Sequence, residues 1–415
     1  MQDNRVSKPM LSAEQAILQM LSEVAPLTQT ISVPISVALD RVLAQPVVSG
    51  INVPGYDNAA MDGYALRAAE VAPGQPLTVA GVALAGHAFT DKVPTGSCVR
   101  ITTGAVMPAG LDTVVMQEQV ELTQTYLQQQ IICQLVPSQG EHVRRAGEDV
   151  AKGAAVFAAG HKLRPADIGL LASLGIANVK VWRQLKVAIF SSGDELVPPG
   201  QSLPDGHIYD SNRYVIAAML QRLGVEVIDL GLLPDDPKAI EQAFAQAMTQ
   251  ADVLITSAGV SVGDADYTRQ ILHKLGQINF WQVAIKPGKP FAFGKLDNCW
   301  FFGLPGNPVA AVVTLEQLVQ PVLRKLSGET VTANVKLLSA ECEVPLKKQP
   351  GRMDFQRGWY WQGEHGLKVK TSGAQSSGML SSIANANCYI VLERDSSSLP
   401  AGEIVSILPF SNLLR

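Results

Sequence analysis

The chain has 415 residues, long enough for about two to four domains. Hydrophobic residues make up 47% of it and charged residues 17%, so it can build folded cores and is not a disordered polymer. The 33 Lys and Arg against 37 Asp and Glu give a net charge of −4, which argues against a nucleic-acid binder that works through a general basic field.

Cysteine and histidine usage gives little support for a metal cluster or a disulfide framework. The five cysteines include no C-x-x-C pair, and the six histidines include no H-x-x-x-H pair. The first ten residues have no apolar core, and no apolar run reaches about 18 residues, so we expect neither a signal peptide nor a membrane span. These features predict free thiols and a cytoplasmic protein.

The first half of the chain is predicted to be a helix followed by mostly β structure. Residues 11–25 have apolar residues at helical spacing, with Ser12 as N-cap and Gln15 in the capping-box position. From residue 51 onwards, short β-branched runs alternate with Gly, Pro and Asp turns, which is typical of a small β domain. A short helix is expected at 165–174, ended by Gly175.

Residues 184–329 alternate between strand-like and helix-like patterns. The expected strands LKVAIF, VEVIDLGLL, DVLIT, INFWQVAI and CWFF are mostly apolar. Helices are expected between them at 212–223, 237–250 and 267–275, and after the last strand at 308–326. This order predicts a doubly wound, mainly parallel sheet. The predicted domains are a mixed α/β linker domain (1–50 with 145–183), an inserted β domain (51–144), the α/β domain (184–329) and a C-terminal β domain without a convincing helix (330–415).

Three strands of the α/β domain are followed by loops rich in Gly and polar residues, at 191–195, 257–266 and 303–308. Ligands bind beyond the carboxyl ends of the strands in open α/β sheets, so these loops are the candidate binding edge. In the third loop, Asn307 is a possible N-cap before Pro308, and the free N–H groups of such a helix start can bind an oxyanion. An ordinary strand-to-helix turn is the alternative, and the Walker and dinucleotide fingerprints are absent.

Charged residues surround this edge. Lys286 and Lys289 lie on a stiff Lys-Pro-Gly-Lys-Pro turn and would repel each other unless an anion lay between them, although solvated loop lysines are the alternative. Carboxylates beside an oxyanion would need a divalent cation, and Mg²⁺ uses one or two carboxylates together with phosphate oxygens. For Asp236 and Asp266, helix capping is the alternative. The acidic residues concerned are Glu195, Asp235, Asp236, Asp264 and Asp266.

Nine segments, in order along the chain, closely resemble the MoeA family: DNAAMDGYA, RITTGA, RRAGED, SSGDEL, IYDSN, GVSVGDADY, IKPGKPFAFG, GLPGNPV and DFQRG. Members of this family are molybdopterin molybdenumtransferases, related to the E domains of molybdenum-cofactor proteins such as gephyrin. The resemblance runs from about residue 11 to residue 410. It implies an elongated four-domain α/β plus β chain, and a homodimer whose cleft lies between the α/β domain of one subunit and β-rich parts of the other.

The resemblance also implies a reaction: adenylylated molybdopterin and molybdate give molybdenum cofactor and AMP, with assistance from Mg²⁺. The residues that match functional positions of the family fall into four groups. The catalytic group is Asp62, Thr103, Asp149, Glu195, Asp235 and Asp266; the substrate-binding group is Ser257, Gly259, Gly263, Gly303, Pro305, Gly306 and Asn307; the molybdate-binding group is Lys286, Lys289, Pro290, Arg357 and Ser377; and the Mg²⁺ ligands are Asp266 and Glu195. Gln282 stands where some members have Lys, so one cation beside the cleft is missing.

Two other functions stay open at this point. One is the molybdopterin adenylyltransferase of the same pathway, which would transfer AMP from ATP but needs no large β insertion and no C-terminal β domain. The other is a non-enzymatic scaffold, a role that gephyrin also has at membranes. The protein partners that the resemblance suggests are that adenylyltransferase and acceptors of the finished cofactor; no nucleic acid and no membrane are expected.

Overall fold

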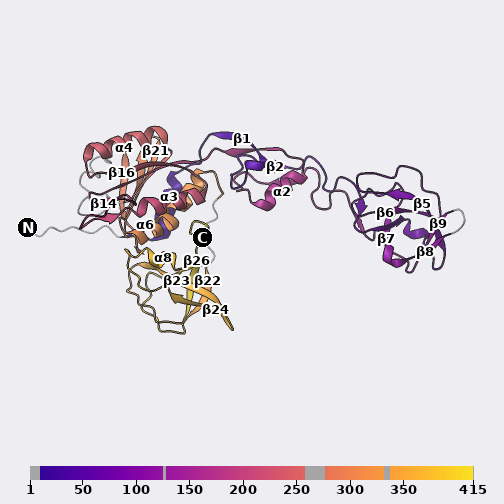
Figure 1. The fold of residues 1–415 in the computed structure, drawn as a ribbon. Helices are drawn as coiled ribbons and strands as arrows, with labels where there is room; N and C mark the ends of the chain where they lie inside the picture. The colour runs from indigo at the N-terminus through magenta and orange to yellow at the C-terminus, as the bar shows by residue number, and fades with distance from the viewer. Residues whose placement is uncertain (1–9, 125–127, 258–275, 331–336, 415) are drawn as a thin grey trace, which may run out of the picture.

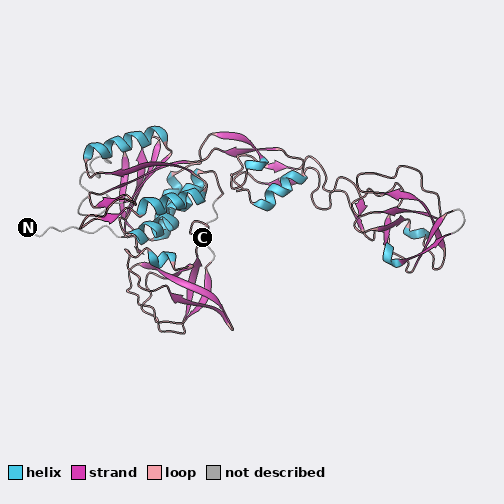
Figure 2. Ribbon diagram, in the orientation of Figure 1, coloured by secondary structure: helices cyan, strands magenta, loops and turns pink. Residues whose placement is uncertain are grey.

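The computed structural model describes residues 10–124, 128–257, 276–330 and 337–414. Its ribbon is elongated, with a small β body at one end, an α/β body beside a β barrel at the other end, and a thin mixed segment between them (Figures 1 and 2). In the described part of the chain no helix is both long enough and apolar enough to cross a membrane.

A six-stranded sheet forms the α/β body. Its strands lie in the order β16 (Glu226–Leu233), β13 (Lys186–Ser192), β17 (Val253–Ser257), β21 (Cys299–Leu304), β20 (Pro290–Leu296) and β18 (Gln277–Gln282). The first four are parallel to one another, and β20 runs antiparallel to both of its neighbours. A mainly parallel sheet is therefore confirmed here, and β20 is a strand that the sequence analysis missed.

Helices cover both faces of this sheet. Alternate residues of β13 enter different cores: Val187 and Ile189 pack with α1 (Ala13–Glu23), α3 (Asn212–Leu223) and α6 (Pro308–Thr314), whereas Ala188 and Phe190 pack with α4 (Pro237–Gln250). The predicted helix 308–326 continues from α6 through a π-helical turn, η4 (Leu315–Val319), into α7 (Gln320–Leu326). The helix predicted at 267–275 lies outside the described residues.

The C-terminal strands close into a barrel that packs on the α/β body. The ring is β23 (Met353–Gly363), β24 (Gly366–Thr371), β22 (Leu338–Cys342), β26 (Ile404–Pro409) and β25 (Cys388–Leu392), and β25 pairs again with β23. The short strand β19 (Ile285–Lys286) comes from the α/β part of the chain and adds to β23. One short helix that the sequence analysis did not expect, α8 (Ser381–Ala384), lies in this part.

Alternate residues of β23 face two different cores, and this alternation positions residues of the site. On β25, Cys388, Ile390 and Leu392 belong to the barrel core, and their partners on β23 are Gly358, Gln356 and Asp354. Phe355 on β23 belongs instead to the core that contains α6. Because side chains alternate along a strand, Asp354 and Gln356 lie on the barrel side of β23, and Phe355 and Arg357 lie on the side of α6.

The far β body is also a six-stranded sheet, in the region predicted to be a β domain. Its order is β7 (Thr113–Met116), β4 (Gly63–Leu66), β6 (Ser97–Ile101), β5 (Pro76–Ala83), β9 (Gln129–Cys133) and β8 (Val120–Gln124). The connecting segment holds α2 (Pro165–Ser173) and three short strand pairs. These pairs are β3 (Asn58–Ala59) with β10 (Val143–Arg144), β2 (Val47–Val48) with β11 (Ala155–Phe157), and β1 (Thr30–Pro34) with β12 (Asn178–Trp182).

Helix α1 begins as predicted, because the Ser12 side chain accepts a hydrogen bond from the Gln15 N–H and the Gln15 side chain returns one to Ser12. Its apolar face, however, packs in the core of the α/β body, and the Leu27 N–H donates to the Leu326 carbonyl at 2.9 Å. The first 50 residues thus contribute to two bodies, which differs from the predicted division. The domain boundaries themselves stay a prediction.

Candidate functional site

The predicted binding edge exists at the carboxyl ends of three neighbouring strands. Ser191 on β13 is paired in register with Ser257 on β17, and their hydroxyl oxygens lie 3.3 Å apart. The Ser191 hydroxyl also donates to a carboxylate oxygen of the buried Asp210 at 3.1 Å. Ser257 is therefore buried at this edge, whereas Gly259, Gly263, Asp264 and Asp266 of the same loop lie outside the described residues.

The loop after β21 is tied to the start of α3. The Asn212 side-chain amide donates to the Gly306 carbonyl at 2.7 Å, and its own oxygen, Oδ1, is buried without a hydrogen-bond partner among the described residues. Gly303 and Pro305 are buried, and Gly306 and Asn307 are exposed at the edge. Asp210 and Asn212 were missed as site residues, although the IYDSN motif contains them directly after its first two residues, which form the short strand β15 (Ile208–Tyr209).

The start of α6 corrects one expectation and supports another. Asn307 occupies the N-cap position with extended backbone, but its side chain caps none of the described N–H groups. The Val309 N–H donates to the Ser377 carbonyl at 3.0 Å, so this donor is not free for an anion. The same bond, however, places the Ser377 loop of the barrel against the candidate edge.

Arg357 is buried between the barrel and α6, with 1% of its surface exposed. Its guanidinium donates to the Ser382 hydroxyl at 3.0 Å and to the carbonyls of Phe355 and Ser376 at 3.3 and 3.2 Å. These acceptors are all neutral, and no described carboxylate accepts a hydrogen bond from it. Burial lowers the pKa of Arg357, while the charge of Asp354 opposes that shift. A buried cation with only neutral acceptors is suited to a bound anion.

The Lys-Pro-Gly-Lys-Pro turn lies between β23 and α6, but its two lysines differ. Lys286 pairs in register with Asp354 and its ammonium lies 3.0 Å from the carboxylate, whereas Lys289 is exposed. A Cβ on Gly288 would lie 2.6 Å from the Thr314 hydroxyl, so the turn touches α6 closely. The Lys286 ammonium is therefore paired with Asp354, although its side chain is 43% exposed, and the expectation that both lysines face one anion stays a prediction.

Only some of the predicted acidic residues of the α/β body lie close to one another. The Asp235 N–H donates to the Asp194 carboxylate at 3.1 Å, which joins the loops after β13 and β16. The Glu195 carboxylate folds back over Gly193, where a Cβ would lie 2.6 Å from it. Asp236 caps α4 through the Ala239 N–H at 3.0 Å, so the capping alternative is confirmed for it. Among the described residues, no group of three metal-ligating side chains is present.

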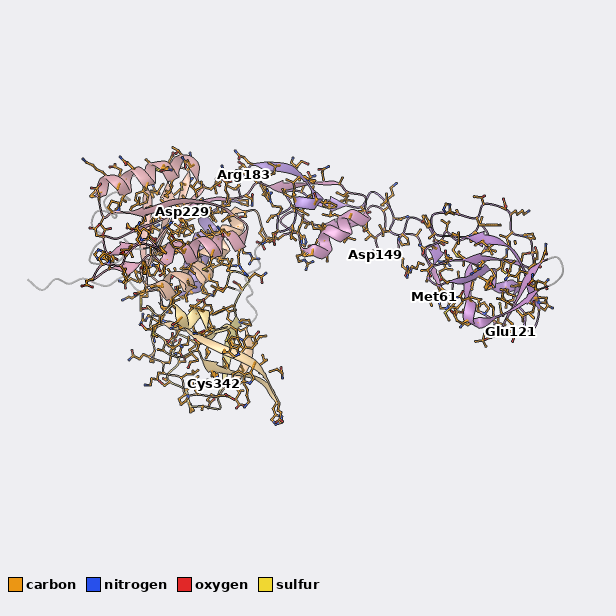
Figure 3. All side chains as sticks on the ribbon, viewed as in Figure 1. Met61, Glu121, Asp149, Arg183, Asp229 and Cys342 are labelled. Atoms are coloured by element: carbon orange, nitrogen blue, oxygen red, sulfur yellow. The ribbon has the colours of Figure 1, made fainter. Side chains whose placement is uncertain are left out.

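The predicted residues of the far β body form their own cluster. The Asp62 carboxylate accepts hydrogen bonds from the Thr103 N–H at 2.6 Å and from its hydroxyl at 2.8 Å, and these bonds lower the pKa of Asp62. Figure 3 shows Met61, the neighbour of Asp62, and Asp149 far along the molecule from Asp229 of the α/β sheet. Within one chain, Asp62, Thr103 and Asp149 are thus not brought to the binding edge.

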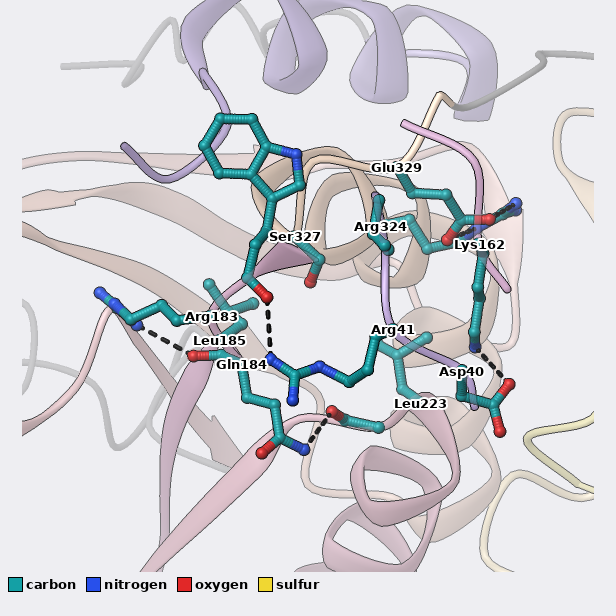
Figure 4. A pocket seen from close by; sticks show the side chains of 13 residues that line it. Asp40, Arg41, Lys162, Arg183, Gln184, Leu185, Leu223, Arg324, Ser327 and Glu329 are labelled. Atoms are coloured by element: carbon teal, nitrogen blue, oxygen red, sulfur yellow. Dashed lines mark hydrogen bonds and ion pairs between the residues drawn. The ribbon is translucent and has the colours of Figure 1, made fainter. Parts of the chain in front are cut away.

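A polar cavity at the junction of the connecting segment and the α/β body is too small for a substrate (Figure 4). It measures about 30 Å³, roughly the volume of one water molecule. Arg41 donates to the Trp182 carbonyl there at 2.9 Å, and Arg183 is bound to Asp252 by two hydrogen bonds. The Arg183–Asp252 pair connects the connecting segment to the α/β body, and the candidate site remains at the strand ends.

Three family models match consecutive parts of the chain: the MoeA N-terminal region (domains I and II) at residues 11–175, a probable molybdopterin binding domain at 188–325, and the MoeA C-terminal region (domain IV) at 339–410. A protein of Haemophilus influenzae named molybdopterin molybdenumtransferase is 49% identical over 98% of this chain and 100% of its own length. The chain belongs to the MoeA family.

Other members of the MoeA family support the same placement. A molybdopterin molybdenumtransferase of Nostoc is 37% identical over 89% of this MoeA chain and 86% of its own length. The crystal structure of a molybdopterin biosynthesis MoeA protein from Pyrococcus horikoshii superposes with a TM-score of 0.82 at 28% identity, covering 97% of this chain and all of the other.

Proposed function

We propose that this MoeA chain is a molybdopterin molybdenumtransferase that inserts molybdate into adenylylated molybdopterin and releases AMP. The observation that carries the proposal is the buried Arg357 guanidinium, whose acceptors are all neutral, next to the Ser377 loop and the start of α6. Molybdate is a compact dianion without apolar surface, so cations and hydrogen-bond donors must supply its binding energy. Two relatives are named molybdopterin molybdenumtransferase, which supports the transfer of molybdenum to molybdopterin.

The pterin nucleotide is assigned to the strand ends. Ser257 and the loop from Gly303 to Asn307 offer hydroxyl and backbone groups there, and Gly259 and Gly263 belong to the loop that follows Ser257. The Asn212 Oδ1, which is buried without a hydrogen-bond partner among the described residues, adds an acceptor beside the loop from Gly303 to Asn307. The residues assigned to molybdate are Lys286, Lys289, Pro290, Arg357 and Ser377, which puts the dianion where the barrel meets α6.

Magnesium belongs to the same proposal. Glu195 and Asp235 lie on adjacent loops at the strand ends, and Asp266 follows β17 in the sequence, outside the described residues. One or two carboxylates together with phosphate oxygens can complete the coordination of Mg²⁺, so a set of three protein ligands is not required. The ion would stabilise negative charge on the departing phosphate. Asp266→Ala is expected to keep bound, uncleaved adenylylated pterin, and wild-type AMP release by this variant would contradict the metal assignment.

A homodimer completes the proposal, because Asp149 and Met61, the neighbour of Asp62, lie far along the molecule from Asp229 of the α/β sheet. Thr103 is hydrogen-bonded to Asp62 and lies with it. In a dimer, the far β body of one subunit can close the site of the other. Asp62→Ala and Asp266→Ala subunits should each be impaired, and their mixture should recover activity since a heterodimer holds one intact site. Absence of recovery after confirmed subunit exchange would refute a shared cleft.

The experiment that tests the function is incubation of the protein with adenylylated molybdopterin, Mg²⁺ and molybdate, with AMP and molybdenum cofactor measured over time. AMP release that depends on molybdate supports the proposal. ATP-dependent AMP transfer to molybdopterin, in a parallel reaction, would instead identify an adenylyltransferase.

A further inference from the structure

The backbone of Arg357 lies on β23 where the neighbouring strand stops. Strand β24 ends with Thr371 opposite Gly358, so Arg357 faces the irregular loop that follows β24. The Ser372 N–H of that loop donates to the Arg357 carbonyl at 2.9 Å, whereas the Arg357 N–H donates to the side-chain oxygen of Gln375 at 2.8 Å. Because Arg357 is 1% exposed, its N–H is buried and needs an acceptor.

The side-chain amide of Gln375 takes the place of a peptide group of the strand that has ended. Its oxygen accepts from the Arg357 N–H, and its NH₂ group donates to the Arg357 carbonyl at 3.1 Å and to the Gly373 carbonyl at 2.9 Å. An NH₂ group has two donors, so both are used. Gln375 therefore joins the loop to the backbone of Arg357 and not to its guanidinium.

The loop that Gln375 holds also carries Ser377, which the resemblance assigns to molybdate. The Ser376 carbonyl accepts from the Arg357 guanidinium at 3.2 Å, and the Ser377 carbonyl accepts from the Val309 N–H of α6 at 3.0 Å. Within the described parts of the chain, no hydrogen bond involves the Ser377 hydroxyl. This hydroxyl is thus available to a ligand beside the guanidinium of Arg357.

We propose that Gln375 is a positioning residue for the molybdate site: it locks the loop to the backbone of Arg357, so that the Ser377 hydroxyl and the guanidinium hold one tetrahedral oxyanion between them. The inference rests on the proposed function. Gln375 is neutral and the backbone uses its amide, so it acts through Ser377 and not by contact with the anion. Its loss should weaken molybdate binding and leave the binding of adenylylated pterin, at the strand ends, nearly unchanged.

The experiment measures, in the full-length protein, the molybdate concentration for half-maximal cofactor formation, the affinity for adenylylated pterin and the melting temperature. Gln375→Met removes the amide and keeps a side chain of similar length. It should raise the molybdate requirement about tenfold, the effect of losing one hydrogen bond to a charged group, and change the pterin affinity by less than about twofold. The matched control is Gln362→Met, at an exposed glutamine near the end of β23, which should change neither quantity.

A double-mutant cycle tests whether Gln375 acts through Ser377. Ser377→Ala should raise the molybdate requirement by a similar factor, and Gln375→Met should add little in that background, because the hydroxyl that it positions is already absent. In the Lys289→Met background the effects of the two substitutions should instead multiply, since Lys289 is assigned to the anion independently of the loop.

Equal losses of pterin and molybdate affinity in Gln375→Met would overturn the positioning role, as would an unchanged molybdate requirement in Ser377→Ala or a full effect of Gln375→Met in the Ser377→Ala protein. Each of these results leaves the proposed function standing when the wild-type protein forms cofactor. Gln375→Asn, whose amide is one methylene too short to reach both backbone groups of Arg357, repeats the test if Gln375→Met does not fold. If the wild-type protein forms no cofactor from molybdate, the proposed function is wrong and the positioning role falls with it.

Discussion

Lys289 gives the sharpest mutational test of the molybdate site, because its side chain is exposed and its contribution to folding is small. Its backbone carbonyl accepts from the Val283 N–H at 2.9 Å, a bond that any side chain preserves. Lys289→Met should therefore change the free energy of unfolding by no more than about 0.5 kcal/mol. Arg357 is a poorer choice, since its burial means that any substitution also alters packing between the barrel and α6.

The effect on molybdate follows from charge. A charge-assisted contact contributes about 1.5–3 kcal/mol, so Lys289→Met should raise the molybdate concentration for half-maximal cofactor formation about tenfold or more. Binding of the adenylylated pterin should change less, because its rings and pyrophosphate have other contacts. The matched control is Lys180→Met on β12, an exposed lysine of the connecting segment with the same change in net charge.

The assay is AMP release and cofactor formation against molybdate concentration, with pterin binding measured separately. Tungstate should compete with molybdate in the wild-type protein and less effectively in the variant. Unchanged molybdate dependence with weaker pterin binding would refute the reasoning and move Lys289 to the nucleotide side of the site. An equal rise of the molybdate requirement in Lys180→Met would show that the reaction responds only to the net charge of the protein.

Two further predictions concern packing and pH. Gly288→Ala should lower the free energy of unfolding by about 1–3 kcal/mol and raise the molybdate requirement, because its φ is +116° and a Cβ would lie 2.6 Å from the Thr314 hydroxyl. Gly169→Ala in α2, where an added Cβ would meet no atom within 4 Å, should raise the free energy of unfolding by about 0.5–1 kcal/mol. Melting temperatures of the two variants equal to that of the wild-type protein would contradict both predictions. Burial raises the pKa of Glu316, so the folded state holds its proton to higher pH than the unfolded chain and stability falls as pH rises between the two pKa values. Glu316→Gln should therefore melt higher than wild type at pH 8 and about equally near pH 4, as calorimetry can show; a difference that grows toward low pH would refute this.

Local sequence patterns predicted the elements that position the site. Apolar strands alternating with capped helices place the ends of β13, β17 and β21 side by side, which the register of Ser191 with Ser257 confirms. β20 was missed because it begins directly after the Lys-Pro-Gly-Lys-Pro turn, without a helix before it. Asn307 has the sequence of a cap, but the Val309 N–H takes a carbonyl from the distant Ser377 loop instead.

Pairing between strands that are distant in sequence determines the features of the site that local sequence patterns did not predict. The pairing of Lys286 with Asp354 depends on the register of β19 against β23, strands 68 residues apart in sequence at these positions, and no local pattern encodes it. The same register separates Lys286 from Arg357, two residues with equal standing in the sequence motifs. The proposed dimer would bring residues of the far β body to the strand ends of the partner subunit, and no local pattern within one chain predicts that arrangement.

The most direct test of the central claim is a single-turnover reaction of the wild-type protein with adenylylated molybdopterin and Mg²⁺, with and without molybdate. The molybdenumtransferase account predicts that AMP and molybdenum cofactor form together when molybdate is present, and that adenylylated molybdopterin stays bound when it is absent. AMP release at the same rate without molybdate, or cofactor formation that does not consume the adenylylated substrate, would contradict it.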